Sequence, residues 1–311
     1  MRFVVIGNDQ MLLSCLQHLQ QRSDAEIGMV FYDIRRSSPA NPTGVFCLTH
    51  GIFAKGVTIL QTREHLSLIR EYKPDVILSI NNFWVLRREI LDIPSFTTVN
   101  FHNASPDGYH GLNIPSWVII NGERKHGAMW HIVEEGIDTG DVLAWSEFDV
   151  TGRDTAASVM VRCIRTGIDL FPGLVVQLIS GQLIRRPQKP GASYYGKMDY
   201  PDSRGYINFD QTGESISRLV RGLNYMPFSN PYLYAKIRHK GKDIIVNAVE
   251  TGAPVPGAAP GTVAFIREDE VGIQCADQLI TIVDAMDEAE EECIGTTMAE
   301  TLGLKEGDVI G

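Results

Sequence analysis

The sequence predicts an α/β protein with a mostly parallel sheet, followed by a smaller unit of short β-strands. Short apolar strands alternate with amphipathic helical segments through the first half of the chain, which is typical of parallel, right-handed βαβ units. The second half carries short strands separated by Gly and Asp turns, which favour a small β-barrel or curled sheet. No internal repeat or low-complexity segment interrupts either pattern.

Each element of the first half follows from its local pattern. Apolar residues at helical spacing predict a helix over Gln10–Gln21. Thr62 is a suitable N-cap for a second helix, which should run to Tyr72 and end at Lys73-Pro74, and Pro39 to Pro42 marks a loop. The predicted strands are Arg2–Ile6, Glu26–Tyr32, Val57–Leu60, Asp75–Ile80, Thr97–His102 and Gly127–Val133.

The second half begins with a long helical pattern over Arg153–Ser180, which Pro172 should kink or split. The stretch from Pro187 to Asp202 is rich in Pro, Gly, Ser and Tyr, as in a linker. We therefore predict a first domain over residues 1–186, a linker over 187–207 and a second domain over 208–311. The second domain should contain a helix over Glu214–Leu223 and strands over Tyr232–Ile237, Asp243–Val249, Gly261–Ile266, Val271–Cys275 and Leu279–Asp284.

Composition narrows the class of protein. The chain has 311 residues, of which 44% are hydrophobic, as expected for one large or two modest globular domains. No apolar run reaches the roughly 20 residues that a membrane span needs, and the first strand enters a turn too soon to be a signal peptide. The five cysteines are scattered and form no Cys-x-x-Cys pair, which favours thiols in a reducing cytoplasm over disulfides or a metal site.

The charge argues against a general nucleic-acid-binding protein, because such a protein normally carries a basic face. The net charge is −10, and the segment from Asn208 to Gly311 holds 8 Lys and Arg residues against 17 Asp and Glu residues. We expect this acidic excess to form a solvated surface that does not hold a phosphate backbone.

Several common cofactor and catalytic motifs are missing. The first strand is followed by Gly7-Asn-Asp-Gln-Met-Leu12 and not by Gly-x-Gly-x-x-Gly, which disfavours a nicotinamide or flavin dinucleotide site. The chain also lacks a Walker loop, a His-Glu-x-x-His pair and a nucleophile elbow.

Asn100, His102 and Asp138 give the strongest functional signal. The first two lie at the carboxyl end of a predicted strand, and Asp138 lies in the loop after the Gly127–Val133 strand. Ligands of such sheets bind beyond the carboxyl ends of the strands, so we expect one shared pocket. An amide can hold an oxyanion, an imidazole can move a proton near pH 7, and a carboxylate can orient the imidazole. Together these roles suggest transfer of an acyl group to an amine.

These motifs resemble those of the formyltransferases that use 10-formyltetrahydrofolate, including methionyl-tRNA formyltransferases. The family pattern is Asn-x-His, a Pro/Gly-rich loop and a downstream Asp-Thr-Gly. Here it stands as Asn100-Phe-His102, Pro106–Gly111 and Asp138-Thr-Gly140. The resemblance implies a Rossmann-like catalytic domain with a mostly parallel sheet, then a small OB-like β-barrel. It extends over nearly the whole chain, through Asn121–Gly127, Met129-Trp-His131, the linker Gly191-Ala-Ser-Tyr-Tyr195, Ile207–Asp210, Ile216–Pro227 and Gly261-Thr-Val263.

The resemblance also implies a role for each site residue. Asn100 would donate to the oxyanion, His102 would take or relay the amine proton, and Asp138 would raise the basicity of His102. The resemblance implies no metal ion in the site. His131 and Trp117 are expected to serve mainly in packing. The residues implied for the folate donor are Ile80, Asn81, Phe83, Trp84, Val133, Glu135, Gly136 and Ile137, and those implied for the acceptor are Ser105, Tyr109 and His110.

The acceptor loop departs from the family, because Asn103-Ala-Ser-Pro-Asp-Gly108 stands where many members have Ser-Leu-Leu-Pro. The stretch Tyr109–Trp117 is most similar to formyltransferases of peptide and polyketide assembly lines. We therefore expect the acceptor to be an amino group on a carrier-bound or small natural-product intermediate. The alternatives are methionyl-tRNA, a nucleotide-linked amino sugar, hydrolysis of the donor, or a non-enzymatic folate-binding or docking module. The chain could stand alone or be a domain of a larger polypeptide.

Overall fold

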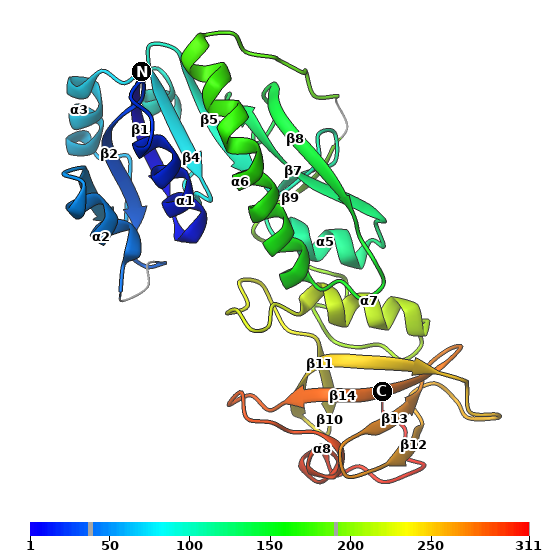
Figure 1. The fold of residues 1–311 in the computed structure, drawn as a ribbon. Helices are drawn as coiled ribbons and strands as arrows, with labels where there is room; N and C mark the ends of the chain where they lie inside the picture. The colour runs from blue at the N-terminus through cyan, green and yellow to red at the C-terminus, as the bar shows by residue number, and fades with distance from the viewer. Residues whose placement is uncertain (37–39, 190–191, 311) are drawn as a thin grey trace. The chain divides into compact units, whose positions relative to one another are not determined.

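The computed structural model describes residues 1–36, 40–189 and 192–310, and its chain divides into two compact units (Figure 1). Unit 1 comprises Met1–Gly111, His126–Phe148 and Arg162–Tyr194, and unit 2 comprises Leu112–Lys125, Asp149–Val161 and Tyr195–Gly311. The domain limits 1–186, 187–207 and 208–311 stay a prediction. Pro39 of the predicted loop and Gly191 of the predicted linker lie outside the described residues.

A seven-stranded sheet in the order β3-β2-β1-β4-β5-β7-β8 forms the centre of unit 1. Its first five strands pair in parallel, whereas β7 runs antiparallel to β5. The expected mostly parallel, Rossmann-like sheet is therefore confirmed. The strands are β1 (Arg2–Gly7), β2 (Glu26–Asp33), β3 (Phe53–Val57), β4 (Val76–Ile80), β5 (Thr97–His102), β7 (Lys125–Ile132) and β8 (Val142–Asp149).

Burial explains why these strands are continuous apolar runs. Central strands β1 and β4 are covered on both faces, and every residue of β4 is buried. Helix α1 (Asp9–Gln20) packs beside α6 (Ala156–Ser180), where the His18 and Phe171 ring centroids lie 5.8 Å apart. Helix α3 (Arg63–Tyr72) begins as predicted, because Thr62 Oγ1 accepts from the His65 backbone N–H at 3.2 Å. Two shorter helices, α2 (Pro42–Thr49) and α4 (Arg88–Leu91), were not predicted.

Two predicted elements were wrong in position. The third strand is Phe53–Val57 and not Val57–Leu60, because Leu60 belongs to the turn before α3 and its carbonyl accepts from His65 Nδ1 at 2.7 Å. Helix α6 begins at Ala156 instead of Arg153, and Pro172 does not split it. Buried apolar side chains on both sides of Pro172, including Phe171 and Leu174, offset the backbone hydrogen bond that a proline cannot donate.

Unit 2 contains a curled, antiparallel half-barrel sheet in the order β10-β11-β14-β13-β12. This confirms the predicted barrel-like second unit. The first strand begins later than expected, because the Asn230 side chain donates to the Leu223 and Leu233 carbonyls and holds that segment in a turn. Its elements are α5 (Ile114–Ile120), α7 (Gly213–Leu223), β10 (Lys236–His239), β11 (Lys242–Gly252), β12 (Val263–Ile266), β13 (Val271–Gln274), β14 (Leu279–Met286) and α8 (Gly295–Leu302).

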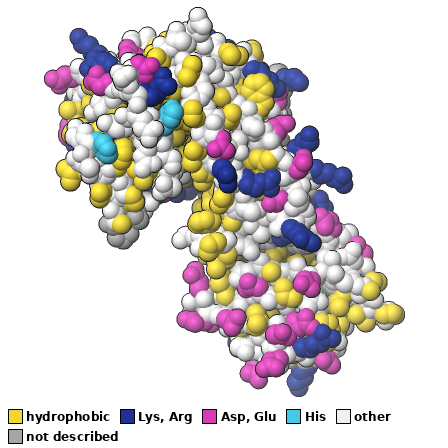
Figure 2. All heavy atoms as spheres, viewed as in Figure 1, with side chains coloured by type: hydrophobic (Ala, Val, Ile, Leu, Met, Phe, Trp, Pro, Cys, Tyr) yellow, Lys and Arg dark blue, Asp and Glu magenta, His cyan; other side chains and the backbone are white. Residues whose placement is uncertain are grey.

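Three further observations bear on the predicted class of protein. Among the described residues, no helix is both long enough and apolar enough to span a bilayer. All five cysteines are free and buried. On the face shown in Figure 2, acidic side chains are spread over the half-barrel unit.

Candidate active site

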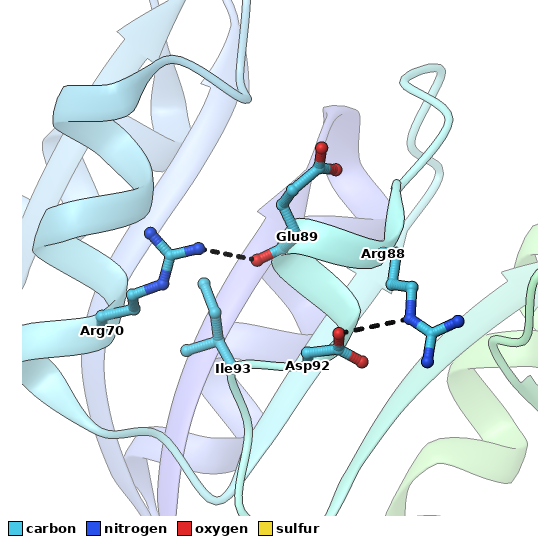
Figure 3. A pocket seen from close by; sticks show the side chains of 5 residues that line it. All are labelled: Arg70, Arg88, Glu89, Asp92 and Ile93. Carbon is cyan, nitrogen blue, oxygen red and sulfur yellow. Dashed lines mark hydrogen bonds and ion pairs between the residues drawn. The ribbon is translucent and has the colours of Figure 1, made fainter.

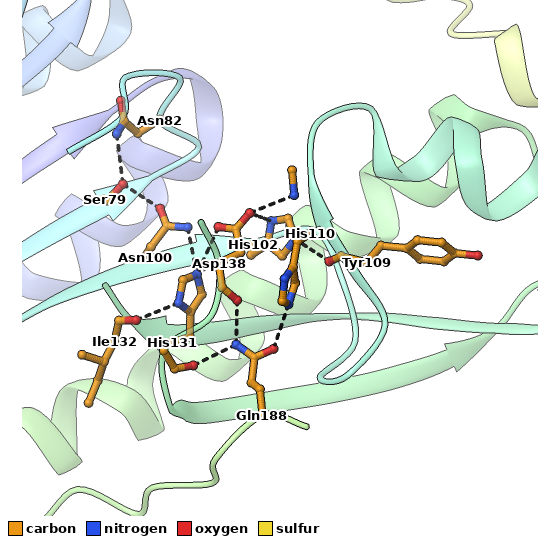
Figure 4. Close-up of polar contacts among 12 residues, drawn as sticks. Ser79, Asn82, Asn100, His102, Tyr109, His110, His131, Ile132, Asp138 and Gln188 are labelled. Atoms are coloured by element: carbon orange, nitrogen blue, oxygen red, sulfur yellow. Dashed lines mark hydrogen bonds and ion pairs between the residues drawn. The ribbon is translucent and has the colours of Figure 1, made fainter. Parts of the chain in front are cut away.

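The site begins with two neighbouring strands of unit 1. Asn100 and His102 are two residues apart on β5, so their side chains leave the same face of the sheet. His131 on β7 pairs directly with Asn100 in the strand register, which places its side chain on that face too. The structure therefore brings an amide and two imidazoles together (Figure 4).

Asp138 reaches the same place by a route that the sequence did not predict. Because β7 is antiparallel to β5, its carboxyl end lies beside Val99 and not at the carboxyl edge of the parallel strands. The loop after β7 folds back, and the Ile132 N–H donates to the Asp141 carbonyl at 2.9 Å. Asp138 has a φ of 56°, a left-handed conformation that Asp and Asn tolerate better than most residues. A Cβ on Gly140 would lie 2.0 Å from the Ile132 oxygen, so this turn requires glycine.

The Asp138 carboxylate lies between the two histidines. Its Oδ2 atom is 3.7 Å from His102 Nδ1 and accepts from the Gly111 N–H at 3.0 Å. Its Oδ1 atom is 3.5 Å from His131 Nε2. The three residues predicted to be catalytic thus share one site with His131. Their catalytic roles stay a prediction.

His102 is arranged to act as a proton acceptor. Its Nε2 atom is 2.9 Å from the Tyr109 carbonyl oxygen, which can only accept, so Nε2 carries a hydrogen. Burial lowers the pKa of His102 from its ordinary value, while the Asp138 carboxylate opposes that shift. The imidazole is therefore neutral near pH 7, and Nδ1 is the nitrogen that can take a proton.

The Asp138 side chain stays ionised in this setting. Burial alone would raise its pKa, but the positive charges that His102 and His131 carry when protonated, together with the Gly111 N–H, hold the pKa below its ordinary value. A proton that arrives at His102 therefore meets a fixed negative charge on the same side of the ring.

Asn100 is held by partners on both sides of its amide group. Its Nδ2 atom is 3.1 Å from His131 Nε2, and its Oδ1 atom is 2.7 Å from Ser79 Oγ. His131 Nδ1 is 2.8 Å from the Ile132 carbonyl, so Nδ1 carries a hydrogen and Nε2 accepts from the amide. An amide has two N–H groups, and the second one is left for a ligand.

His131 combines the predicted packing with a place in the site. It is buried and hydrogen-bonded, as expected from its apolar strand, and it also contacts Asn100 and Asp138. Only the strand register could have revealed this, because His131 is far from both partners in sequence.

The residues implied for the acceptor take different positions. Ser105 Oγ is buried without a hydrogen-bond partner among the described residues. Tyr109 contributes its carbonyl to His102, and its ring points away from the histidines in Figure 4. His110 Nε2 is 3.3 Å from Gln188 Oε1, a residue that lies in the predicted linker and was missed by the sequence analysis.

The residues implied for the donor lie in two segments that the structure brings together. Arg88 Nη1 in α4 is 2.9 Å from Glu135 Oε1 in the loop after β7. Phe83 and Ile137 are exposed, although the Arg36 guanidinium lies 3.6 Å from the centroid of the Phe83 ring, and Gly136 lies beside Ile137 on the same exposed loop.

Four of the residues implied for the folate donor either have buried side chains or already form hydrogen bonds within the protein. The side chain of Ile80 is fully buried, and Trp84 packs against the core with its indole N–H directed at the Thr58 carbonyl. Asn81 has a φ of 48° and donates to Asp9 Oδ2, while the Val133 N–H donates to the Thr98 carbonyl.

A surface hollow of about 370 Å³ lies elsewhere on unit 1 (Figure 3). It is lined by Arg70, Arg88, Glu89, Asp92 and Ile93. It contains no predicted catalytic residue, so the chemistry of the Asn100 site is the better guide to function. Within residues 1–36, 40–189 and 192–310, no group of three or more His, Cys, Asp or Glu side chains is placed to hold a metal ion.

Comparison with known families and relatives shows what the chain is similar to. Residues 1–175 match the family model described as formyl transferase, and residues 201–302 match that of the formyl transferase C-terminal domain. The chain is 26% identical over 243 residues to methionyl-tRNA formyltransferase of Ruminiclostridium cellulolyticum, covering 78% of this chain and 76% of the relative. It is 24% identical to that of Acetivibrio thermocellus over the full length of both chains.

Solved structures show the same fold. An N-formyltransferase from Helicobacter canadensis, solved with folinic acid and dTDP-3-aminofucose, superposes with a TM-score of 0.69 at 17% identity, over 91% of this chain and 98% of that one. HypX from Aquifex aeolicus gives a TM-score of 0.65 at 18% identity over 97% of this chain. The chain spans about half of HypX, or 48% of its length. At these identities the likeness concerns the fold alone.

Proposed function

The chain belongs to the formyl transferase family, and we propose that it moves a formyl group from 10-formyltetrahydrofolate to an amino group of a carrier-bound or small natural-product intermediate. It is accordingly an enzyme of the group-transfer class. The observation that carries the proposal is the single site in which Asn100, His102 and Asp138 meet.

Each of these side chains has a defined task in this chemistry. As the amine attacks the formyl carbon, the second N–H of Asn100 donates to the oxygen that becomes negative, a contribution typically worth about 3 kcal/mol. His102 Nδ1 takes the proton that the amine loses, and Asp138 and the Tyr109 carbonyl stabilise the imidazolium. Collapse of the adduct releases the formamide, and His102 returns the proton to the departing folate nitrogen.

The donor fits the exposed surface beside this site. Ile137 and the uncovered part of Phe83 provide apolar contact area, and Arg88 and Glu135 form an exposed ion pair between their two segments. The donor supplies an activated formyl group, so the chain needs to position and polarise it without forming a covalent bond to it. The free, buried cysteines support our proposal that the enzyme works in a reducing cytoplasm.

Two features support a carrier-bound or small acceptor. The acceptor loop, residues 103–108, departs from the common family sequence, and Tyr109 and His110 directly after it lie beside His102 and Gln188. The segment from residue 208 onward is acidic, with 17 Asp and Glu residues against 8 Lys and Arg residues, which opposes a tRNA backbone.

Formylation of methionyl-tRNA is the second candidate function. The observation in its favour is the name of the relatives, one of which aligns with the whole chain. A nucleotide-linked amino sugar is a further acceptor to include in any assay, because the relative from Helicobacter canadensis was solved with one.

The test is turnover of 10-formyltetrahydrofolate by the purified protein, followed by absorbance. The acceptor panel should contain a carrier-bound aminoacyl group, a small amine, a nucleotide-linked amino sugar, methionyl-tRNA and no amine at all. We expect release of tetrahydrofolate only with the carrier-bound or small amine, and its loss in Asp138→Asn. Release of tetrahydrofolate without an amine would instead indicate a hydrolase. If the protein neither turns over nor binds folate, a non-enzymatic docking module is the remaining interpretation.

A further inference from the structure

We propose that Ser79 and Asn82 are positioning residues that fix the orientation of the Asn100 amide. The inference rests on the proposed function, because the amide orientation matters only if Asn100 donates to an oxyanion. It comes from a chain of hydrogen bonds that runs across three segments of unit 1 and whose direction is set at both ends by backbone groups (Figure 4).

This chain of hydrogen bonds starts at the turn after β4. The Trp84 backbone N–H, which can only donate, is 3.0 Å from Asn82 Oδ1. This identifies the other end of the Asn82 amide as Nδ2. That nitrogen donates to Ser79 Oγ at 3.2 Å and to the Trp84 carbonyl at 2.9 Å.

Ser79 determines the direction of the next hydrogen bond, which leads to Asn100. Its oxygen receives the hydrogen of Asn82, so its own hydrogen is available for Asn100 Oδ1 at 2.7 Å. Asn100 must therefore turn Nδ2 toward His131 Nε2 at 3.1 Å. The chain of hydrogen bonds ends at the Ile132 carbonyl, to which His131 Nδ1 donates at 2.8 Å.

Both ends of the chain impose the same direction. With His131 Nε2 as an acceptor, the backbone N–H at Trp84 and the backbone carbonyl at Ile132 cannot exchange roles, so the side chains between them share one consistent orientation. Without this constraint, the Asn100 amide could turn over and present its carbonyl oxygen to the reacting group. A carbonyl beside a developing oxyanion would repel it instead of stabilising it.

Ser79 and His131 are the buried members of this series, whereas Asn82 and Asn100 are partly exposed. Ser79 is 1% exposed and His131 is 2% exposed. A buried donor or acceptor that loses its partner keeps the full cost of its desolvation. Within the part of the chain that the structure describes, the Ser79 hydroxyl is the group that donates to Asn100 Oδ1.

The test compares Ser79→Ala, Asn82→Asp and the double variant with the wild-type enzyme in the formyl-transfer assay. Ser79→Ala removes the hydrogen bond to Asn100 Oδ1. In Asn82→Asp, the carboxylate can only accept, so it competes for the Ser79 hydrogen and Asn100 loses its donor. We expect each variant to lower kcat by about 10- to 100-fold, which is at or below the cost of about 100- to 1,000-fold for complete loss of one oxyanion donor, because Asn100 is misplaced and not removed. The KM of the amine should change less than about twofold, since neither residue is expected to touch the acceptor.

The double variant separates orientation from general damage. Once Ser79 is alanine, Asn82 has no path to Asn100, so the second substitution should lower kcat little further. Ser116→Ala is the matched control, because it also removes a buried serine hydroxyl that is hydrogen-bonded, here to Tyr225 Oη at 2.9 Å in unit 2. It should lower the melting temperature without lowering kcat. If Ser79→Ala does not fold, Asn82→Asp alone carries the test.

The outcomes also separate this inference from the proposed function. A wild-type protein without formyl transfer overturns both. An active wild type whose Ser79→Ala and Asn82→Asp variants keep full kcat overturns only the role of the chain of hydrogen bonds. A kcat loss in the double variant equal to the product of the two single losses would also overturn this role. Such a result would mean that Ser79 and Asn82 act independently of each other.

Discussion

At the scale of single residues, the site depends on how burial and one carboxylate set the charge of His102. Burial lowers the pKa of this imidazole, and Asp138 at 3.7 Å raises it. The residue is therefore a neutral base near pH 7 that becomes better stabilised once it is protonated.

The first prediction concerns the pH dependence of kcat. A base is lost when it is protonated, so activity should fall as the pH drops through the pKa of His102, which lies below the ordinary value of about 6.5. Asp138→Asn removes the charge that raises this pKa, and Asn also tolerates the φ of 56° at this position. We expect kcat of the variant to fall by about 100-fold or more, with its acidic limb at a lower pH than in the wild type. A limb that moves to higher pH would contradict this account.

The second prediction concerns stability and His126. Its Nε2 atom donates to the Asn103 carbonyl at 2.9 Å, and burial lowers its pKa to about 4. Between that pKa and the unfolded value of about 6.5, the unfolded chain binds the proton and the folded protein does not, so stability falls as the pH falls. From pH 6.5 to pH 5 this amounts to about 1.6 kcal/mol. Urea unfolding at both pH values should show a loss smaller by that amount in His126→Gln, and equal losses in both proteins would refute it.

At the scale of elements, a short segment after α6 ties the site together. We call residues 186–189 the strap. Arg186 forms an ion pair with Asp107 at 2.8 Å, and the Lys189 N–H donates to the same carboxylate at 2.6 Å. Gln188 Nε2 donates to the Asp138 carbonyl at 2.7 Å and to the Gly140 carbonyl at 2.8 Å. The strap thus connects the acceptor loop with the turn that carries Asp138.

The third prediction is that Gln188→Ala lowers kcat by about tenfold, because the Asp138 turn loses two hydrogen bonds and its carboxylate is less well placed beside His102. Gln177→Ala is the matched control. Its side chain likewise bridges two backbone groups, at Leu143 and Ile184, but outside the site. Steady-state kinetics of both variants decide the matter: the same kcat loss in both would show that the effect is not specific to the strap.

At the scale of the whole molecule, unit 2 includes a helix, α5, that comes from the middle of the chain. Helix α5 lies between two strands of the large sheet in sequence, yet it packs against α7. A Cβ on Gly222 of α7 would lie 2.6 Å from an Ile120 side-chain carbon, and Ser116 of α5 is hydrogen-bonded to Tyr225. This close packing explains why α5 is apolar over nearly its whole length.

The fourth prediction follows from this packing. A fragment of residues 1–207 leaves α5 without α7, and each uncovered Ile or Val side chain costs about 1.5–3 kcal/mol relative to its buried state. We expect the fragment to bind a hydrophobic dye, to melt at a lower temperature than the full chain and to aggregate. Co-expression with residues 208–311 should restore solubility. A fragment that melts like the intact protein would show that α5 is stable alone.

The sequence by itself determined the two fold classes, the start of α3 at Thr62 and the three side chains Asn100, His102 and Asp138 that meet in the site. Apolar periodicity, capping residues and short motifs are local properties, so they can be recognised without a structure. Only the tertiary structure decided that β7 runs antiparallel to β5, which places His131 beside Asn100 and makes the Asp138 loop fold back. It also decided that Gln188 and the Ser79–Asn82 pair reach the site. The reason is physical: an apolar run specifies a buried strand but neither its direction nor its register, and contacts between residues far apart in the chain depend on both.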